Sequence, residues 1–197
     1  RELEDLRQFM DIGEGSVAVD ETEDIDWINN WKQYFHQFYI DDILVIPSWE
    51  NIKPEDTDKM VLHIDPGTAF GTGMHETTQL CIRQLRKFIT SETELLDVGT
   101  GSGILAILSL MFGAKHAVGT DLDICAVEAV AQNCDVNGID PAQFDMMIGN
   151  IITEKEIQDR VGYGKYDIVA ANILAEVLVP LMPVVAKCLK PGGTVIT

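Results

Sequence analysis

The sequence has little positive charge. Its 197 residues include 14 lysines and arginines against 32 aspartates and glutamates, which gives a formal net charge of −18 at pH 7. Phosphate backbones select the opposite balance, so we expect no direct binding to nucleic acid. A basic protein surface or a cationic small molecule would instead be attracted.

Cysteines are also few, and they do not follow a metal-binding or disulfide pattern. The four are Cys81, Cys125, Cys134 and Cys188, with no close CxxC pairing and no familiar zinc spacing to the four histidines. We therefore expect no metal site and a reduced, cytoplasmic chain. No apolar run approaches the roughly 20 residues that cross a bilayer, so we expect no membrane span.

The composition is that of a packed globular protein. Hydrophobic residues make up 46% of the chain and charged residues 23%, which lies outside the range of disordered chains. The length suffices for one full domain, or for one domain and a fragment of another. The chain opens at Arg1 without a signal peptide and stops at Thr197 within a predicted strand, so we expect a piece of a longer protein.

The first 49 residues differ from the rest. An acidic stretch at 20–26 precedes Trp27, Trp31 and Phe35, whose spacing places them on one face of a helix. We expect this aromatic face to pack on a neighbouring layer. Residues 38–46 then indicate either two short strands around an Asp-Asp turn or one longer strand with a bulge.

From residue 60 onward strands alternate with helices. Strands are predicted at 60–64, 95–98, 117–120, 144–148, 166–171 and 194–197, and helices at 77–89, 104–112, 124–136 and 174–189. Nearly continuous apolar strands between helices indicate a parallel sheet covered on both faces. The predicted fold class is α/β, a doubly wound Rossmann-like sheet with its ligand site at the carboxyl ends of the strands.

Two of these predicted helices carry more specific expectations. The helix at 124–136 is expected to turn four residues inward, namely Val127, Val130, Ala131 and Cys134. In the helix at 174–189, Pro180 and Pro183 are expected to shift the start or to produce a kink.

A glycine-rich turn joins the strand at 95–98 to the following helix. Gly99, Gly101 and Gly103 lie in the run Asp97 to Gly103, where they permit a tight turn and close approach of a ligand to the backbone. The dinucleotide fingerprint G-x-G-x-x-G/A places its third small residue one position later, which disfavours a nicotinamide dehydrogenase. Alone, the run is also consistent with a turn that binds no ligand.

Two polar residues follow the next two predicted strands. Asp121 lies about twenty residues beyond the glycine run, where a carboxylate can accept hydrogen bonds from both ribose hydroxyls of a nucleoside. Asp123 is explained more simply as the cap of the following helix. Asn150 is either an adenine contact or part of a Gly-Asn turn. A G-x-G-x-G loop with this acid resembles the class I S-adenosylmethionine-dependent methyltransferases.

Two further segments resemble one family, the ribosomal protein L11 methyltransferases. Residues 65–78, D-P-G-T-A-F-G-T-G-M-H-E-T-T, resemble the loop that precedes the family's nucleoside-binding strand. Residues 171–175, A-N-I-L-A, match the family's motif after the fourth strand of the sheet. Trp27, Trp31 and the segment 46–49 resemble its linker region, so the resemblance covers nearly all of residues 24–197.

The resemblance implies S-adenosylmethionine as cofactor and ribosomal protein L11 as substrate, with methyl transfer to lysine and N-terminal amino groups. The cofactor-binding positions that we expect are Thr78, Gly99, Gly101, Gly103, Asp121, Asn172, Phe70 and Asn150. Asn172 is also expected to position the amine, as the related Asn/Asp motif does, and is the one candidate catalytic residue.

The residues alone leave simpler interpretations open. Thr78 is also explained as a cap at a helix start, and Asn172 as the cap of the segment that follows it. His75 is also explained as a loop histidine with satisfied hydrogen bonds. Phe70 is either a wall of the amine pocket or the hydrophobic anchor of its loop.

The resemblance also sets the expected domain organisation. Residues 1–49 are expected to be the remnant of an N-terminal substrate-recognition domain with a linker helix and short strands. Residues 50–197 are expected to form the methyltransferase domain, its sheet truncated after the fifth strand because the family has two more. The alternatives are an amino-group methyltransferase for another protein or a small molecule, and a non-catalytic module that binds S-adenosylmethionine.

Overall fold

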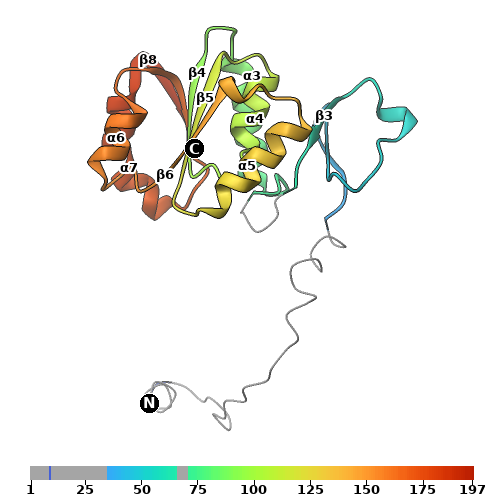
Figure 1. Ribbon diagram of the computed structural model, residues 1–197, viewed down its shortest axis with the longest axis horizontal. Coiled ribbons are helices and arrows are strands. Elements are labelled where there is room, and N and C mark those ends of the chain that lie inside the picture. The colour runs from blue at the N-terminus through green and yellow to red at the C-terminus, as the bar shows by residue number, and fades with distance from the viewer. Residues whose placement is uncertain (1–8, 10–34, 66–70) are drawn as a thin grey trace. The chain divides into compact units, whose positions relative to one another are not determined.

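The structure is a computed structural model that describes Phe9, residues 35–65 and residues 71–197 (Figure 1). Phe35–Thr197 form one compact unit, and the fold described below is that of this unit. The predicted helix that carries Trp27 and Trp31 lies outside the described residues, as does the candidate site residue Phe70.

The described residues form eight strands in two sheets. The strands are β1 (Phe38–Ile40), β2 (Ile43–Ile46), β3 (Met60–His63), β4 (Glu94–Val98), β5 (His116–Asp121), β6 (Phe144–Ile148), β7 (Tyr166–Ala170) and β8 (Leu189–Ile196). The helices are α3 (Glu76–Phe88), α4 (Ile104–Met111), α5 (Cys125–Val136), α6 (Lys155–Val161) and α7 (Ala175–Cys188), with short 3-10 helices η2 (Pro54–Asp56) and η3 (Pro141–Gln143). None of these described helices combines the length and the apolar character that a membrane span requires.

The larger sheet has five parallel strands in the order β6-β5-β4-β7-β8. The chain builds outward from β4 through β5 to β6, then returns to the other side of β4 for β7 and β8. The strand order therefore reverses between β4 and β7, where a doubly wound sheet opens its ligand crevice. This arrangement confirms the predicted α/β fold with a parallel sheet.

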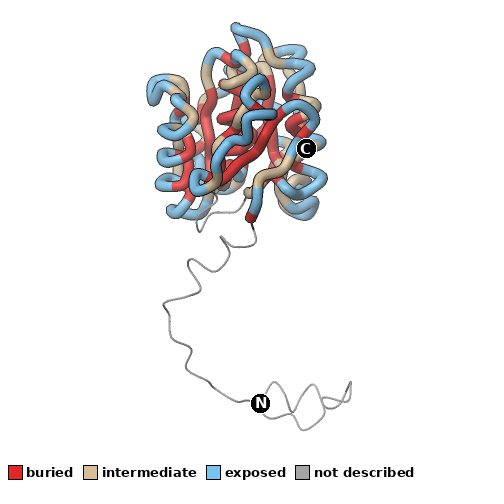
Figure 2. The backbone as a smooth tube through the Cα atoms, turned by 90° about the vertical axis from the view of Figure 1, so that its right-hand side faces the viewer, coloured by how far each residue is buried: buried red, intermediate tan, exposed pale blue. Residues whose placement is uncertain are grey.

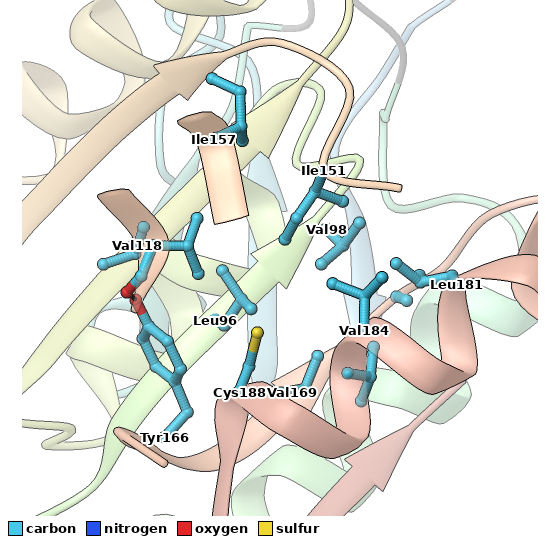
Figure 3. Packing of buried hydrophobic residues seen from close by; sticks show 13 residues of the cluster. Leu96, Val98, Val118, Ile151, Ile157, Tyr166, Val169, Leu181, Val184 and Cys188 are labelled. Carbon is cyan, nitrogen blue, oxygen red and sulfur yellow. Dashed lines mark hydrogen bonds between the residues drawn. The ribbon is translucent and has the colours of Figure 1, made fainter. Parts of the chain in front are cut away.

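Helices cover both faces of the larger sheet. Figure 1 shows α6 and α7 on one side of the strands and α3, α4 and α5 on the other. On the α6 and α7 side, buried side chains from strands and helices form one apolar cluster (Figure 3), which includes Leu96, Val98, Val118, Tyr166, Val169, Leu181, Val184 and Cys188. Figure 2 shows buried residues concentrated in the strands and exposed ones on the outer helix surfaces. Burial of this apolar surface, at roughly 25 cal/mol per Å², is the main source of stability.

The smaller sheet has the order β1-β2-β3, with β1 antiparallel and β3 parallel to β2. Residues 38–46 are two strands around a turn and not one bulged strand, since Asp41 adopts a φ of 54° between them. All four residues of β2 are buried. The sheet joins strands from both sides of residue 49, the predicted domain boundary.

The sheets and the last helix differ from the sequence-based prediction. The strands form two sheets and not one sheet truncated after its fifth strand, because β3 pairs with β2. Strand β8 begins at Leu189 rather than at residue 194, and its pairing with β7 shifts register between Tyr166 and Ile168. Pro180 and Pro183 both lie inside α7, which begins at Ala175.

Helix α5 turns a different face inward from the predicted one. Val130 is buried as expected, but Val127 is 40% exposed and Ala131 is exposed. The helix packs at the side of β6, the edge strand, so only a narrow face is covered. That face includes the polar residue Asn133, which tolerates complete burial because its amide is hydrogen-bonded to backbone groups.

Candidate functional site

The glycine loop, residues 99–103, connects β4 to α4 at the carboxyl end of the larger sheet. Gly99, Gly101 and Gly103 have φ values of 73°, 53° and 83°, which residues with a Cβ rarely adopt. At Gly99 a Cβ would also lie 2.5 Å from Cγ2 of Ile173, just after β7. The loop therefore needs glycine for its conformation and, at Gly99, for its contact with the β7–α7 connection.

Asp121, the last residue of β5, holds the glycine loop from the neighbouring strand. Its Oδ2 accepts the N–H of Gly101 at 2.8 Å and its Oδ1 accepts the N–H of Asp123 at 2.9 Å. A carboxylate offers about four lone-pair positions, so both oxygens can accept further donors such as ribose hydroxyls. Asp123 lies one residue before Ile124, the cap position of α5, and its Oδ1 accepts the N–H of Cys125, the first residue of that helix, at 2.9 Å.

A second carboxyl group, that of Asp97, is buried near the end of β4. Burial raises the pKa of Asp97 to about 7, and the negative charge of Asp121 acts in the same direction. The hydroxyl of Thr100, which donates to Oδ2 at 2.8 Å, and the N–H of Ala106 oppose this increase. Asp97 thus changes its charge near neutral pH, although the sequence analysis treated it only as the start of the glycine run.

Asn172 and Thr78 lie 94 residues apart in the sequence and meet beside the switch point. The Nδ2 of Asn172 donates to Oγ1 of Thr78 at 2.7 Å. Thr78 is buried in the first turn of α3, and Asn172 follows β7 and is partly buried. Asn172 is not the cap of the next helix, because Leu174 occupies that position. No described residue donates to Oδ1 of Asn172, so this oxygen is available to accept a hydrogen bond.

His75 and Asn150 both make local hydrogen bonds. His75 caps α3, with its Nδ1 accepting the N–H of Thr77 at 3.3 Å. The Oδ1 of Asn150 accepts the N–H groups of Ile152 and Thr153 at 2.9 and 3.3 Å. The Asn150 oxygen therefore stabilises the turn after β6, and its Nδ2 is the group left for a ligand at this end of the sheet.

Two buried residues that hold the glycine loop, Ser102 and Asn133, are not predicted from the sequence pattern. Ser102 Oγ donates to the carbonyl oxygen of Gly71 at 2.6 Å, and Asn133 Nδ2 donates to that of Ser102 at 2.8 Å. Both side chains belong to residues with no exposed surface. The only signal for Asn133 in the sequence is an asparagine next to apolar positions of the predicted helix. Helical periodicity alone does not show whether Asn133 or the adjacent Cys134 faces inward.

The structure thus brings most of the predicted site to one end of the larger sheet. Asp121 bonds to the glycine loop, Asn172 bonds to Thr78, and Ile173, next to Asn172, lies against Gly99. Asn150 follows the edge strand β6. In the described part of the chain, no three histidine, cysteine, aspartate or glutamate side chains are grouped to hold a metal ion. The arrangement can bind a nucleoside and present a hydrogen-bond acceptor next to it.

Comparisons with known proteins identify the family of this chain. The sequence model of one family, described as ribosomal protein L11 methyltransferase (PrmA), matches residues 2–197. The ribosomal protein L11 methyltransferase of Agathobacter rectalis is 54% identical over 198 residues, covering 99% of this chain and 61% of that protein. That of Lachnoclostridium phytofermentans is 44% identical over 205 residues, covering 97% and 62%. The chain thus spans about three fifths of the length of these curated relatives.

Solved structures support the same assignment. A crystal structure of ribosomal protein L11 methylase from Lactobacillus delbrueckii subsp. bulgaricus matches with a TM-score of 0.70 and 33% identity, over 82% of this chain and 78% of that one. A precorrin 8w decarboxylase from Methanobacterium thermoautotrophicum, at 18% identity and a TM-score of 0.54 over 68% of this chain and 67% of that one, shares the fold alone. On the family match and the relatives' identity, the chain belongs to the ribosomal protein L11 methyltransferase family.

Proposed function

We propose that this chain is the cofactor-binding and catalytic part of a protein methyltransferase that methylates lysine and N-terminal amino groups of ribosomal protein L11. The observation that carries the proposal is the hydrogen bond between Asn172 and Thr78 beside the glycine loop. This bond supports the proposal because it engages the amide nitrogen of Asn172 and leaves its oxygen to accept a hydrogen bond beside the glycine loop. Family membership supports the choice of substrate.

The residues present fit S-adenosylmethionine. Gly99 and Gly101 expose backbone to a ligand without side chains, and the Asp121 carboxylate keeps acceptor capacity for two ribose hydroxyls. Asn150 Nδ2 remains available at the end of β6 for an adenine nitrogen. When bound, this cofactor supplies a methyl group activated on a sulfonium sulfur.

Asn172 and Thr78 are proposed to orient the substrate amine. Because Oγ1 of Thr78 accepts from Nδ2 of Asn172, the amide is held with Oδ1 free to accept an amine N–H. Orientation of this kind corresponds to effective molarities of roughly 10⁵–10⁸ M in favourable cases. A lysine amine with a pKa of about 10.4 must also lose a proton, which contact with apolar side chains favours. Ile173 and Leu174, which follow Asn172 in the sequence, are proposed to supply such contacts.

The remaining parts of the protein's function concern substrate recognition and location. The relatives are longer than this chain, and we propose that the longer protein recognises L11 through a domain of which residues 1–49 are the remnant. We also propose that further strands extend its larger sheet. All four cysteines are free thiols, which supports a reducing, cytoplasmic location.

Mass spectrometry of L11 tests the proposal. L11 is incubated with S-adenosylmethionine and a version of this protein extended to the length of its relatives, alongside an Asn172→Ala variant. We expect methyl additions at lysine and N-terminal amines with the unmodified protein. The variant should lose most of this transfer while binding S-adenosylhomocysteine, the demethylated product, within about threefold, because the lost amide contacts the amine.

Other outcomes would contradict the proposal in distinct ways. Transfer to other amines but not to L11 would replace the proposed substrate and leave an amino-group methyltransferase. Binding of S-adenosylhomocysteine with no transfer to any amine would indicate a non-catalytic binding module. Equal transfer by the Asn172→Ala variant would remove Asn172 from the amine site.

A further inference from the structure

One buried amide, that of Asn133, joins the smaller sheet to the glycine loop. Its Oδ1 accepts the N–H of Asp65 at 2.9 Å, and its Nδ2 donates to the carbonyl oxygens of Asp65 and Ser102 at 3.2 and 2.8 Å. Asp65 lies just after β3, and Ser102 lies in the middle of the glycine loop. The side chain of α5 therefore bonds simultaneously to both segments.

One helical turn further along the chain, Asn137, the residue directly after α5, makes the equivalent contact with β3 alone. Its Oδ1 accepts the N–H of His63 at 2.9 Å, and its Nδ2 donates to the carbonyl oxygens of His63 and Asn133 at 2.6 and 2.7 Å. The two amides satisfy backbone groups of the β3 segment as a neighbouring strand would. They are a matched pair, of which Asn133 alone reaches the glycine loop.

The position of Ser102 explains why this contact affects the ligand site. On one side of it, the N–H of Gly101 is bound to Asp121. On the other side, Gly103 begins the turn into α4 with a φ of 83° and lies close to α5, since a Cβ on it would be 3.1 Å from Val130. Ser102 is fully buried, and its carbonyl oxygen bonds to Asn133. A shift of Ser102 would therefore move the two glycines that flank it.

The hydroxyl of Ser102 adds a second connection. It donates to the carbonyl oxygen of Gly71 at 2.6 Å, and a Cβ on Gly71 would lie 2.9 Å from this hydroxyl. Gly71 precedes α3, which carries Thr78. Ser102 is thus bonded directly to the segment before α3. Through Asn133 it is also connected to the segment after β3.

We propose that Asn133 is a positioning residue, which holds the glycine loop in its ligand-binding conformation by bridging Ser102 to the segment after β3. The identity of the ligand rests on the proposed function, but the bridge and its effect on the loop do not. Asn137 should share the structural role of Asn133 toward β3 without its effect on the loop.

Hydrogen exchange of the ligand-free chain tests the bridge itself. The variants are Asn133→Asp and Asn137→Asp, which keep the shape and the acceptor oxygen of each amide but remove its donors. We expect amides at 99–105 to exchange about tenfold faster in the Asn133 variant and within about twofold of the wild type in the Asn137 variant. Amides at 60–65 should exchange faster in both. Unchanged loop exchange in both, or equal acceleration in both, would overturn the proposal.

Calorimetry with S-adenosylhomocysteine tests the consequence for binding, at a temperature well below both unfolding midpoints. We expect affinity at least about tenfold weaker for Asn133→Asp and within about threefold of the wild type for Asn137→Asp. Equal affinities of the two variants would reduce Asn133 to a structural role and overturn the inference. If the wild-type chain does not bind S-adenosylhomocysteine, the proposed function is contradicted. The hydrogen-exchange experiment still tests whether Asn133 bridges the two segments. Should either charged variant not fold, Asn133→Ala and Asn137→Ala replace the pair.

Discussion

The two ends of the larger sheet differ in what their polar side chains hold in place. At the carboxyl end, side chains such as Asp121 bond to backbone groups of nearby loops. At the amino end, charged side chains also pair with each other: Lys190 Nζ lies 2.8 Å from Oδ2 of Asp167, each side chain being 38% exposed, and the same oxygen accepts the N–H of Glu94 at 2.9 Å. Lys115 Nζ lies 3.5 Å from Oε1 of Glu94 at the same end. The bonds at the carboxyl end hold a loop between a strand and a helix, whereas the ion pairs at the amino end join side chains of the strands and their flanking residues.

The difference follows from the direction of the chain. Helices α4, α5 and α7 begin at the carboxyl end of the sheet, and the first turn of a helix presents N–H groups without intrahelical partners. Carboxylates and anionic or polar ligands are favoured there. At the amino end the helices finish and the connections are exposed, so charged side chains are screened by solvent. Substitutions at the two ends should therefore differ in kind as well as in size.

The largest expected change in stability on substitution is a difference between two glycines with similar backbone angles. Gly99 at the carboxyl end has a φ of 73°, and Gly138, shortly before β6 at the amino end, has a φ of 66°. A Cβ at Gly99 would lie 2.5 Å from Ile173, whereas nothing lies within 4 Å of one at Gly138. We expect Gly99→Ala to lower the free energy of unfolding by roughly 2–4 kcal/mol and Gly138→Ala by roughly 1–2 kcal/mol, the cost of the backbone angle alone.

Urea denaturation of the two glycine variants measures this difference. Equal destabilisation would mean that the contact between the glycine loop and Ile173 relaxes without cost, and the carboxyl end would then be less constrained than its geometry indicates.

The next effect concerns two neighbouring carboxylates at the carboxyl end. Asp121→Ala should weaken binding of S-adenosylhomocysteine by roughly 1.5–3 kcal/mol, because charge-assisted hydrogen bonds to the ribose and the bond to Gly101 are lost. Asp123→Ala removes only the bond to Cys125 at the start of α5. It should lower the free energy of unfolding by about 1 kcal/mol and leave affinity unchanged.

Calorimetric titration of both variants distinguishes these roles. If Asp121→Ala bound as tightly as the wild type, or if Asp123→Ala lost as much affinity, the ribose would not be held by Asp121.

A pH dependence that originates at Asp97 is a separate effect, which accumulates over several pH units and is not ranked with the substitutions. Its pKa is raised to about 7 by burial, against about 3.9 in an unfolded chain. Between these values the folded state keeps a proton that the unfolded state releases, so this group's contribution to stability falls as pH rises, by about 1.4 kcal/mol per unit. Above pH 7 the contribution is constant.

Comparison with Asp97→Asn isolates this contribution from other titrating groups. The difference in unfolding free energy between wild type and variant should change from pH 4 to 7 and level off at higher pH. A difference that is independent of pH would show that Asp97 is ionised in the folded protein across this range.

The smallest effect is expected at the amino end. Lys190→Met removes the pair with Asp167, whose charges are partly exposed, and should change the free energy of unfolding by about 0–1 kcal/mol. The change should shrink further in high salt. Affinity for S-adenosylhomocysteine should stay the same. A loss of affinity comparable to that of Asp121→Ala would abolish the distinction between the two ends.

Local signals in the sequence predicted part of this organisation. The positive φ values of the glycine loop and the position of Asp121 after the next strand follow from motif spacing, and the structure has both. The bond between Asn172 and Thr78 joins residues far apart in the chain, so their roles were proposed from a family resemblance and not from spacing. The raised pKa of Asp97 depends on burial, which a strand pattern indicates only in general terms.

Other features could not be predicted because they depend on which segments become neighbours. Strand β3 was correctly expected, but its pairing with β2 in a separate sheet required knowledge of a non-local partner. The prediction of the inward face of α5 was partly wrong, since Val127 is exposed and Asn133 is buried. Amphipathic patterns assume apolar residues inside, whereas here a buried amide bonds to the backbone of two distant segments.

The most direct test of the account is a titration of the isotopically labelled chain with S-adenosylhomocysteine, followed by the amide resonances in NMR spectra. We predict that the largest shift changes occur at residues 99–103, Asp121 and Asn172, at the carboxyl end of the larger sheet. Residues such as Glu94, His116 and Asp167 at the amino end should serve as unaffected internal references. Changes centred on the amino end, or no changes at millimolar ligand, would contradict the nucleoside site on which the proposed function depends.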